Sequence, residues 1–97
     1  MTTLPLPPMV GSRKRAHVLA DSLGGLQGKR VVVDCRDLIA ATESFADELI
    51  TEILIKRDAA EMHFINVSDL DFANWVDEHA RIHDVGQRVK VDRKPVF

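Results

Sequence analysis

His79 and His83 stand four positions apart in a segment whose pattern predicts a helix. Side chains at this spacing share one helical face, so the two imidazoles could bind the same metal ion. Acidic residues lie close by in the sequence: Asp77, Glu78 and Asp84. A zinc site needs more than two such ligands, and nothing in the sequence places His17 or His63 beside the pair. Since solvated or half-buried histidines are commoner, the sequence predicts neither a metal site nor a cofactor.

Two other segments could carry chemistry, and each has a simpler interpretation. Cys35 ends a strand that is expected to be buried, where a free cysteine behaves as a small hydrophobe. The segment 24–30 resembles a phosphate-binding loop, but Leu23 stands where that loop needs glycine, and the segment precedes a strand instead of following one. The chain also lacks tyrosine, a serine-elbow pattern and a dinucleotide-binding glycine loop. We therefore expect a protein that is not an enzyme.

Composition narrows the class of protein. The chain of 97 residues suits one domain, and its net charge of −2 gives no general attraction for nucleic acid. Its basic cluster at 13–15 is too short to change this. A single cysteine fits a reducing cytosol, no apolar run approaches the roughly 20 residues of a membrane span, and the N-terminus does not resemble a signal peptide. We expect a cytoplasmic protein that binds neither nucleic acid nor membrane.

Helices and strands alternate in the predicted order. Ser12 would cap a first helix that ends near Leu23, a second helix would cover about 45–57, and Ser68 would cap a third with Asp71 as its capping-box partner. The predicted strands span residues 30–35, 61–67 and 87–91. The domain would therefore cover residues 12–91, between a proline-rich extended arm (1–11) and a C-terminal tail (92–97).

The valines at 31–33 indicate the type of sheet. Three consecutive apolar residues without polar alternation favour burial on both faces, as in a parallel sheet covered by helices. Strands joined through helices become parallel neighbours, and both crossover helices then lie on one face. We expect an α/β fold with a small, mostly parallel sheet of three to four strands. The first helix, or a second copy of the chain, would cover the other face.

The second predicted helix has an apolar face and a polar face. Phe45, Leu49 and Ile53 are expected to point into the core. The polar side chains are expected to face solvent: Asp47, Glu48, Thr51, Glu52 and Lys56. Asp34 interrupts the preceding strand near its end, where ligands bind in open α/β sheets. The alternative, which we favour, is that Asp34 accepts hydrogen bonds from the following loop.

The segment Val31–Cys35, a short loop and then Ser44-Phe45-Ala46-Asp47-Glu48 resemble the STAS-like domain family. The order of elements agrees over residues 12–91, and the resemblance is specific over Val31–Leu54. In the related anti-sigma-factor antagonists, a kinase that doubles as an anti-sigma factor phosphorylates a serine at this helix start. Aligning Asp34 and Leu49 with the family pattern brings Ser44 onto that serine.

Two roles stay open for Ser44. As a helix N-cap, with Asp47 at the capping-box position, it would accept a hydrogen bond from a first-turn amide. As a phosphosite, it would place a phosphate at the positive end of the helix dipole.

The resemblance implies a regulatory module without catalytic activity. Its partner would be a protein that docks on the helix start at 42–48, for example a histidine-kinase-like ATPase. The expected partner-binding residues are Asp34, Thr42, Glu43, Ser44, Asp47 and Glu48. The alternative is a self-associating accessory protein, encoded by a phage or mobile element, whose N-terminal arm reaches a neighbouring copy in a homodimer.

Overall fold

The structure is a computed structural model that describes residues 1–94. Its strands are β1 (Thr2–Pro5), β2 (Met9–Val10), β3 (Arg30–Asp34), β4 (Ala40–Ala41), β5 (Glu61–Val67) and β6 (Val89–Arg93). Its helices are α1 (Arg13–Asp21), α2 (Glu43–Ile50), the π-helical η1 (Thr51–Lys56), α3 (Leu70–Ile82) and the 3-10 turn η2 (Gly86–Arg88). None of the helices among these residues is long and apolar enough to cross a membrane.

The main sheet has the strand order β1-β3-β5-β6, and every neighbouring pair is parallel. The predicted α/β fold with a small parallel sheet is confirmed. β6 overlaps the strand predicted at 87–91 and lies at one edge of the sheet. Arg88, however, belongs to η2, and its guanidinium donates to the carbonyl oxygens of Leu54, Ala59 and Ala60.

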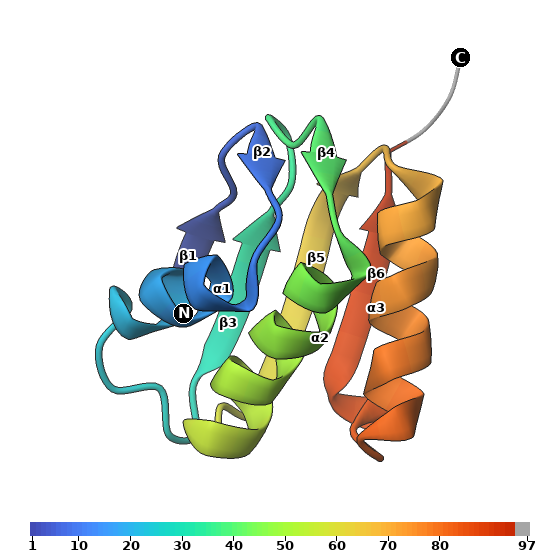
Figure 1. Cartoon of the computed structure of the whole chain (residues 1–97). Coiled ribbons are helices and arrows are strands. Elements are labelled where there is room, and N and C mark those ends of the chain that lie inside the picture. The colour runs from blue at the N-terminus through green and yellow to red at the C-terminus, as the bar shows by residue number, and fades with distance from the viewer. Residues whose placement is uncertain (95–97) are drawn as a thin grey trace.

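The helices α1, α2 and α3 lie side by side on one face of the sheet (Figure 1). The expectation that α1 covers the other face is wrong, whereas cover by a second copy stays a prediction. β1 precedes α1 and pairs in parallel with β3, so α1 is itself a crossover helix and lies on the same face as the others. The uncovered face carries mainly polar side chains: Arg30, Asp34, Glu61, His63, Lys90 and Asp92.

All three valines of β3 are buried, although helices cover only one face of the sheet. Val31 and Val33 belong to the hydrophobic core and are fully buried. Val32 points to the uncovered face and is 8% exposed. Continuous burial therefore indicated a parallel sheet correctly, but it did not require a second layer of helices.

Residues 2–10 belong to the domain. β1 pairs with β3, and β2 pairs in parallel with β4 as a separate two-stranded sheet. The apolar residues of this segment, Leu4, Leu6 and Val10, are buried in the core. The predicted boundary at residue 12 is therefore wrong. Pro5 does not prevent this pairing, because it occupies an edge strand, where a missing amide costs no ladder hydrogen bond.

The C-terminal boundary also shifts. Asp92 and Arg93 extend β6, and the amide of Lys94 donates to the carbonyl oxygen of Val67. The remaining residues of the predicted tail, 95–97, lie outside the described part of the chain.

Two helix ends differ from prediction. Ser12 caps α1, as expected, and accepts from the amide of Arg15. For α3 the cap is Asp69 instead of Ser68, since its carboxylate accepts from the amides of Asp71 and Phe72. The expected pairing of Ser68 with Asp71 is therefore wrong.

The burial of Glu52 differs from prediction. α2 continues as the π-helical η1, and Glu52 in η1 is only 1% exposed. Glu52 follows the buried residue Leu49 by three positions, so it lies at the edge of the apolar face, where α1 packs against it. The prediction that Glu52 faces solvent is wrong.

Candidate functional site

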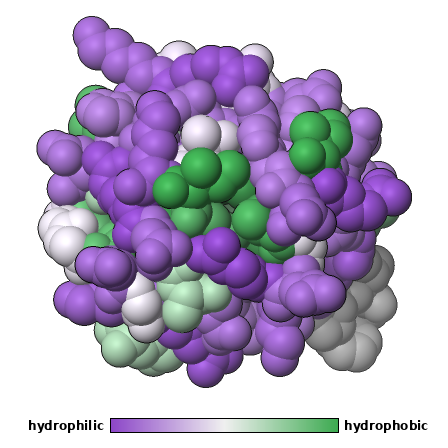
Figure 2. Space-filling model, turned by 90° about the horizontal axis from the view of Figure 1, so that it is seen from below, coloured by the Kyte–Doolittle hydropathy of each residue, from purple (hydrophilic) through white to green (hydrophobic). Residues whose placement is uncertain are grey.

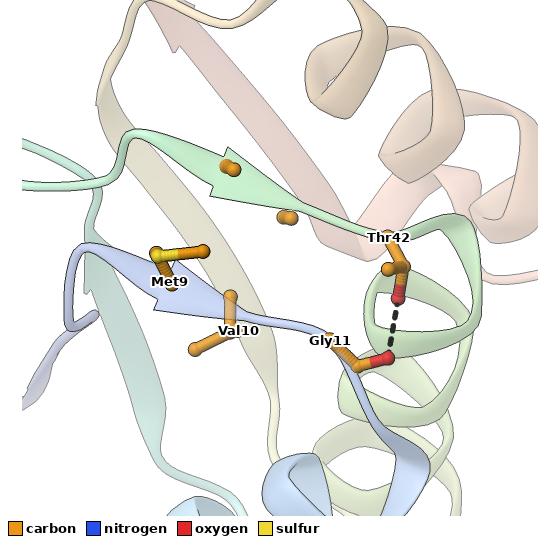
Figure 3. A pocket seen from close by; sticks show the side chains of 6 residues that line it. Met9, Val10, Gly11 and Thr42 are labelled. Atoms are coloured by element: carbon orange, nitrogen blue, oxygen red, sulfur yellow. Dashed lines mark hydrogen bonds between the residues drawn. The ribbon is translucent and has the colours of Figure 1, made fainter.

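Thr42, and not Ser44, caps α2. Thr42 has extended backbone angles, and its hydroxyl accepts from the amide of Phe45 at 3.1 Å. The same hydroxyl donates to the carbonyl oxygen of Gly11 at 2.8 Å, which ties the helix start to the chain after β2 (Figure 3). Because β4 ends at Ala41, the helix begins earlier than predicted. Both the Ser44 cap and its capping box with Asp47 are wrong.

Ser44 nevertheless lies in the first turn of α2. It is the second residue of the helix and is exposed. Glu43, the first residue, is also exposed. The side chain of Ser44 is therefore accessible at the end of the helix where backbone amides point outward.

An apolar depression adjoins this helix start. It is lined by Met9, Val10, Gly11, Ala40, Ala41 and Thr42 (Figure 3). Met9 is 74% exposed and Ile39, which precedes the lining residues of β4, is 75% exposed. Sequence analysis missed this surface because it depends on pairing β2 with β4, two short strands some thirty residues apart.

The acidic side chains of α2 contact basic side chains on both neighbouring helices. Asp47 and Glu48 accept from Arg13 of α1 at 2.6 and 3.2 Å. Glu43 lies 2.8 Å from His79 of α3. Asp47 and Glu48 are thus half-buried between helices, and the prediction that they face solvent is wrong.

Asp47 also joins the two histidines that the sequence singled out. Its Oδ1 atom lies 2.7 Å from Nε2 of His83 and 3.1 Å from Nδ1 of His79. Burial raises the pKa of Asp47, but hydrogen bonds from His83 and Arg13 outweigh burial, so the net pKa is lowered. The carboxylate that contacts both histidines therefore comes from α2, and not from the acidic residues at the adjacent positions 77, 78 or 84.

A second charged cluster surrounds Glu52. The buried carboxylate lies 3.0 Å from Nδ1 of His17, accepts from Lys56 at 2.9 Å and accepts from Arg57. Burial alone would raise the pKa of Glu52, but the hydrogen bonds from Lys56 and Arg57 dominate and lower it from 4.5 to about 2. The carboxylate is therefore ionised inside the fold.

Asp34 lies on the other side of the sheet. Its Oδ1 atom accepts from the side-chain amide of Asn66 and from the backbone amide of Arg36, both at 3.0 Å. These two hydrogen bonds lower the pKa of Asp34. The interpretation of Asp34 as an acceptor for the following loop is confirmed. Because Asp34 points away from the helices, the fold does not bring it together with Ser44.

Two further residues are placed by the structure. Cys35 is 1% exposed, and burial raises the pKa of its thiol to about 12. Trp75 is half-buried and packs against the core.

Comparison with known proteins finds no matching family model, no similar curated protein and no similar solved structure.

Proposed function

We propose that the protein is a non-catalytic, STAS-like regulatory module that docks a protein partner. The docking surface comprises Met9, Ile39, Glu43 and Ser44. The observation that carries the proposal is the exposure of Met9 and Ile39, at 74% and 75%, beside the exposed first turn of α2. The surface leaves out Asp34, Asp47 and Glu48, since contacts within the chain hold these side chains half-buried, whereas Glu43 contacts His79 but remains 51% exposed.

The composition of this surface suits a protein interface. Protein interfaces combine a small apolar centre with a polar rim, and methionine adapts its shape to different partners. Here the apolar depression is the centre, and Glu43 and Ser44 are the rim. At the opposite end of the molecule, small apolar patches are surrounded by hydrophilic side chains (Figure 2).

Ser44 is the proposed regulatory position. A phosphate there would lie at the positive end of α2, close to first-turn amides. The nearby carboxylates of Asp47 and Glu48 are paired with the guanidinium of Arg13, which reduces their repulsion of a phosphate. Phosphorylation would add charge to the rim and alter partner affinity.

Affinity capture with single variants tests this proposal. We expect a host partner that wild-type protein retains, that Met9→Ser and Ile39→Ser release, and whose binding Ser44→Asp changes. Leu70→Ser is the matched control, because Leu70 is 63% exposed at the start of α3. Equal loss of the partner with Leu70→Ser, or no partner at all, would contradict the proposal. Peptide mapping of protein from the native host tests Ser44 phosphorylation directly.

The alternative of arm exchange between copies has lost its motivation. The apolar arm residues Leu4, Leu6 and Val10 are buried against their own chain. Homodimer formation stays a prediction, and light scattering tests it.

A further inference from the structure

Three potential metal ligands from two helices converge at one point. Asp47 Oδ1, His79 Nδ1 and His83 Nε2 all lie within 4.8 Å of one another. Asp47 comes from α2, His79 comes from the last turn of α3, and His83 is the residue that caps the end of α3. In a tetrahedral site with bonds of roughly 2.0–2.1 Å, ligand atoms are about 3.3 Å apart. The two separations from Asp47 Oδ1, 2.7 and 3.1 Å, are therefore within a small side-chain adjustment of that geometry.

The second polar atoms of Asp47 and His79 are already engaged. Arg13 donates to Asp47 Oδ2 at 2.6 Å, which leaves Oδ1 directed at the histidines. His79 Nε2 lies 2.8 Å from Glu43 Oε2. A carboxylate on the far nitrogen of a metal-bound histidine fixes its tautomer and ring orientation. Both partners therefore orient a ligand atom toward the common point.

An independent observation concerns His79 Nδ1. This atom is buried and has no hydrogen-bond partner among the described residues. With its proton on Nε2 facing Glu43, His79 directs the lone pair of Nδ1 toward the Asp47 carboxylate, 3.1 Å away. Two lone pairs at this distance repel each other, and a cation between them would turn that repulsion into attraction.

We propose that Asp47, His79 and His83 form a binding site for a divalent first-row transition metal ion such as Zn²⁺. Two imidazoles and one carboxylate suit zinc, and three protein ligands leave a coordination position for water or another small ligand. The ion would link α2 to α3. The site shares Glu43 with the docking surface, but its three ligands do not belong to that surface, and the tests of the docking surface use Met9, Ile39 and Ser44 instead.

Calorimetric titration of untagged, chelator-treated protein with zinc chloride tests the site. We expect saturable binding of one ion per chain. Glu43→Gln should weaken affinity about tenfold, since it alters the orientation of a ligand, and Asp47→Asn and His83→Ala should weaken it further. His63→Ala is the matched control, because His63 also contacts a carboxylate, that of Asp92, but lies on the uncovered sheet face. Its affinity should equal that of wild type.

Two further measurements keep the test decisive. Circular dichroism establishes that each variant is folded, and Asp47→Asn, which preserves side-chain shape, replaces His83→Ala if the latter unfolds. Nitrogen NMR shifts should show zinc on Nδ1 of His79 and on Nε2 of His83. Absence of saturable binding, or zinc affinity unchanged in folded Asp47→Asn, would overturn the proposal and leave a hydrogen-bonded cluster alone.

Discussion

Nδ1 of His17 on α1 lies 3.0 Å from Oε1 of Glu52 on η1. The side chain of Glu52 is 1% exposed, whereas that of His17 is 56% exposed. Lys56 and Arg57 contact the same carboxylate. The buried carboxylate of Glu52 is thus paired with the cationic groups of Lys56 and Arg57. Its contact with His17 connects α1 to η1, which continues the central helix α2.

Replacement of Glu52 by glutamine should destabilise the fold by about 3 kcal/mol, because removing one partner of a buried ion pair leaves the others uncompensated. Urea unfolding measures the change. Glu61→Gln is the control, since the Glu61–Arg30 pair is 39% and 47% exposed and should contribute less than about 1 kcal/mol. Equal effects of the two substitutions would contradict the structural role of Glu52.

Stability should fall in acid because of Glu52. Its pKa is 4.5 ordinarily and about 2 in the folded chain, so the folded state favours the ionised form. The resulting stabilisation is fully present above pH 4.5 and is lost as the pH falls toward 2. Unfolding free energies measured over this range should decrease steadily in the wild type. In Glu52→Gln the slope should be shallower, and an unchanged slope would count against this assignment.

Thr42→Ala should destabilise the protein by about 1 kcal/mol, the usual cost of removing a helix N-cap. Ser44→Ala should change stability by less than about 0.5 kcal/mol, because Ser44 is an exposed residue inside the first turn. Thermal unfolding of both variants shows which of the two residues, Thr42 or Ser44, caps α2. A larger loss in Ser44→Ala than in Thr42→Ala would restore the Ser44 cap.

The thiol of Cys35 should resist modification in the folded protein. Burial raises its pKa to about 12, so little thiolate is present near neutral pH, and reagents cannot reach the sulfur. Reaction with an aromatic disulfide reagent at pH 8 should be about 100-fold slower, or more, than for the chain in denaturant. Comparable rates in the two states would show that Cys35 is accessible.

The parallel sheet was predictable because its signal is local. The valines of β3 and the alternation of helices with strands both follow from short stretches of sequence, and Ser12 was recognisable as a cap from its own neighbours. β1 was missed since the prolines at its end and just after it are typical of irregular segments. The strand exists because a parallel partner, β3, is available at the sheet edge.

The candidate sites were harder to predict because they depend on contacts between distant segments. The pair His79 and His83 was visible from spacing, but Asp47 becomes their neighbour only when α2 and α3 pack together. Glu52 was misplaced because its burial depends on contact with α1, which the pattern of its own helix does not show. Met9 joins the docking surface only through the pairing of β2 with β4.

The proline in β1 limits how far the sheet can grow. β1 forms an outer edge, and proline 5 has no amide hydrogen to offer an incoming strand. A second molecule approaching this edge therefore meets an incomplete row of donors, which opposes fibre-like addition. Removal of the first ten residues would make β3 the edge strand and would expose its backbone donors and acceptors, beside apolar side chains, to other molecules. The N-terminal segment thus covers the edge of β3 and prevents the addition of further strands there.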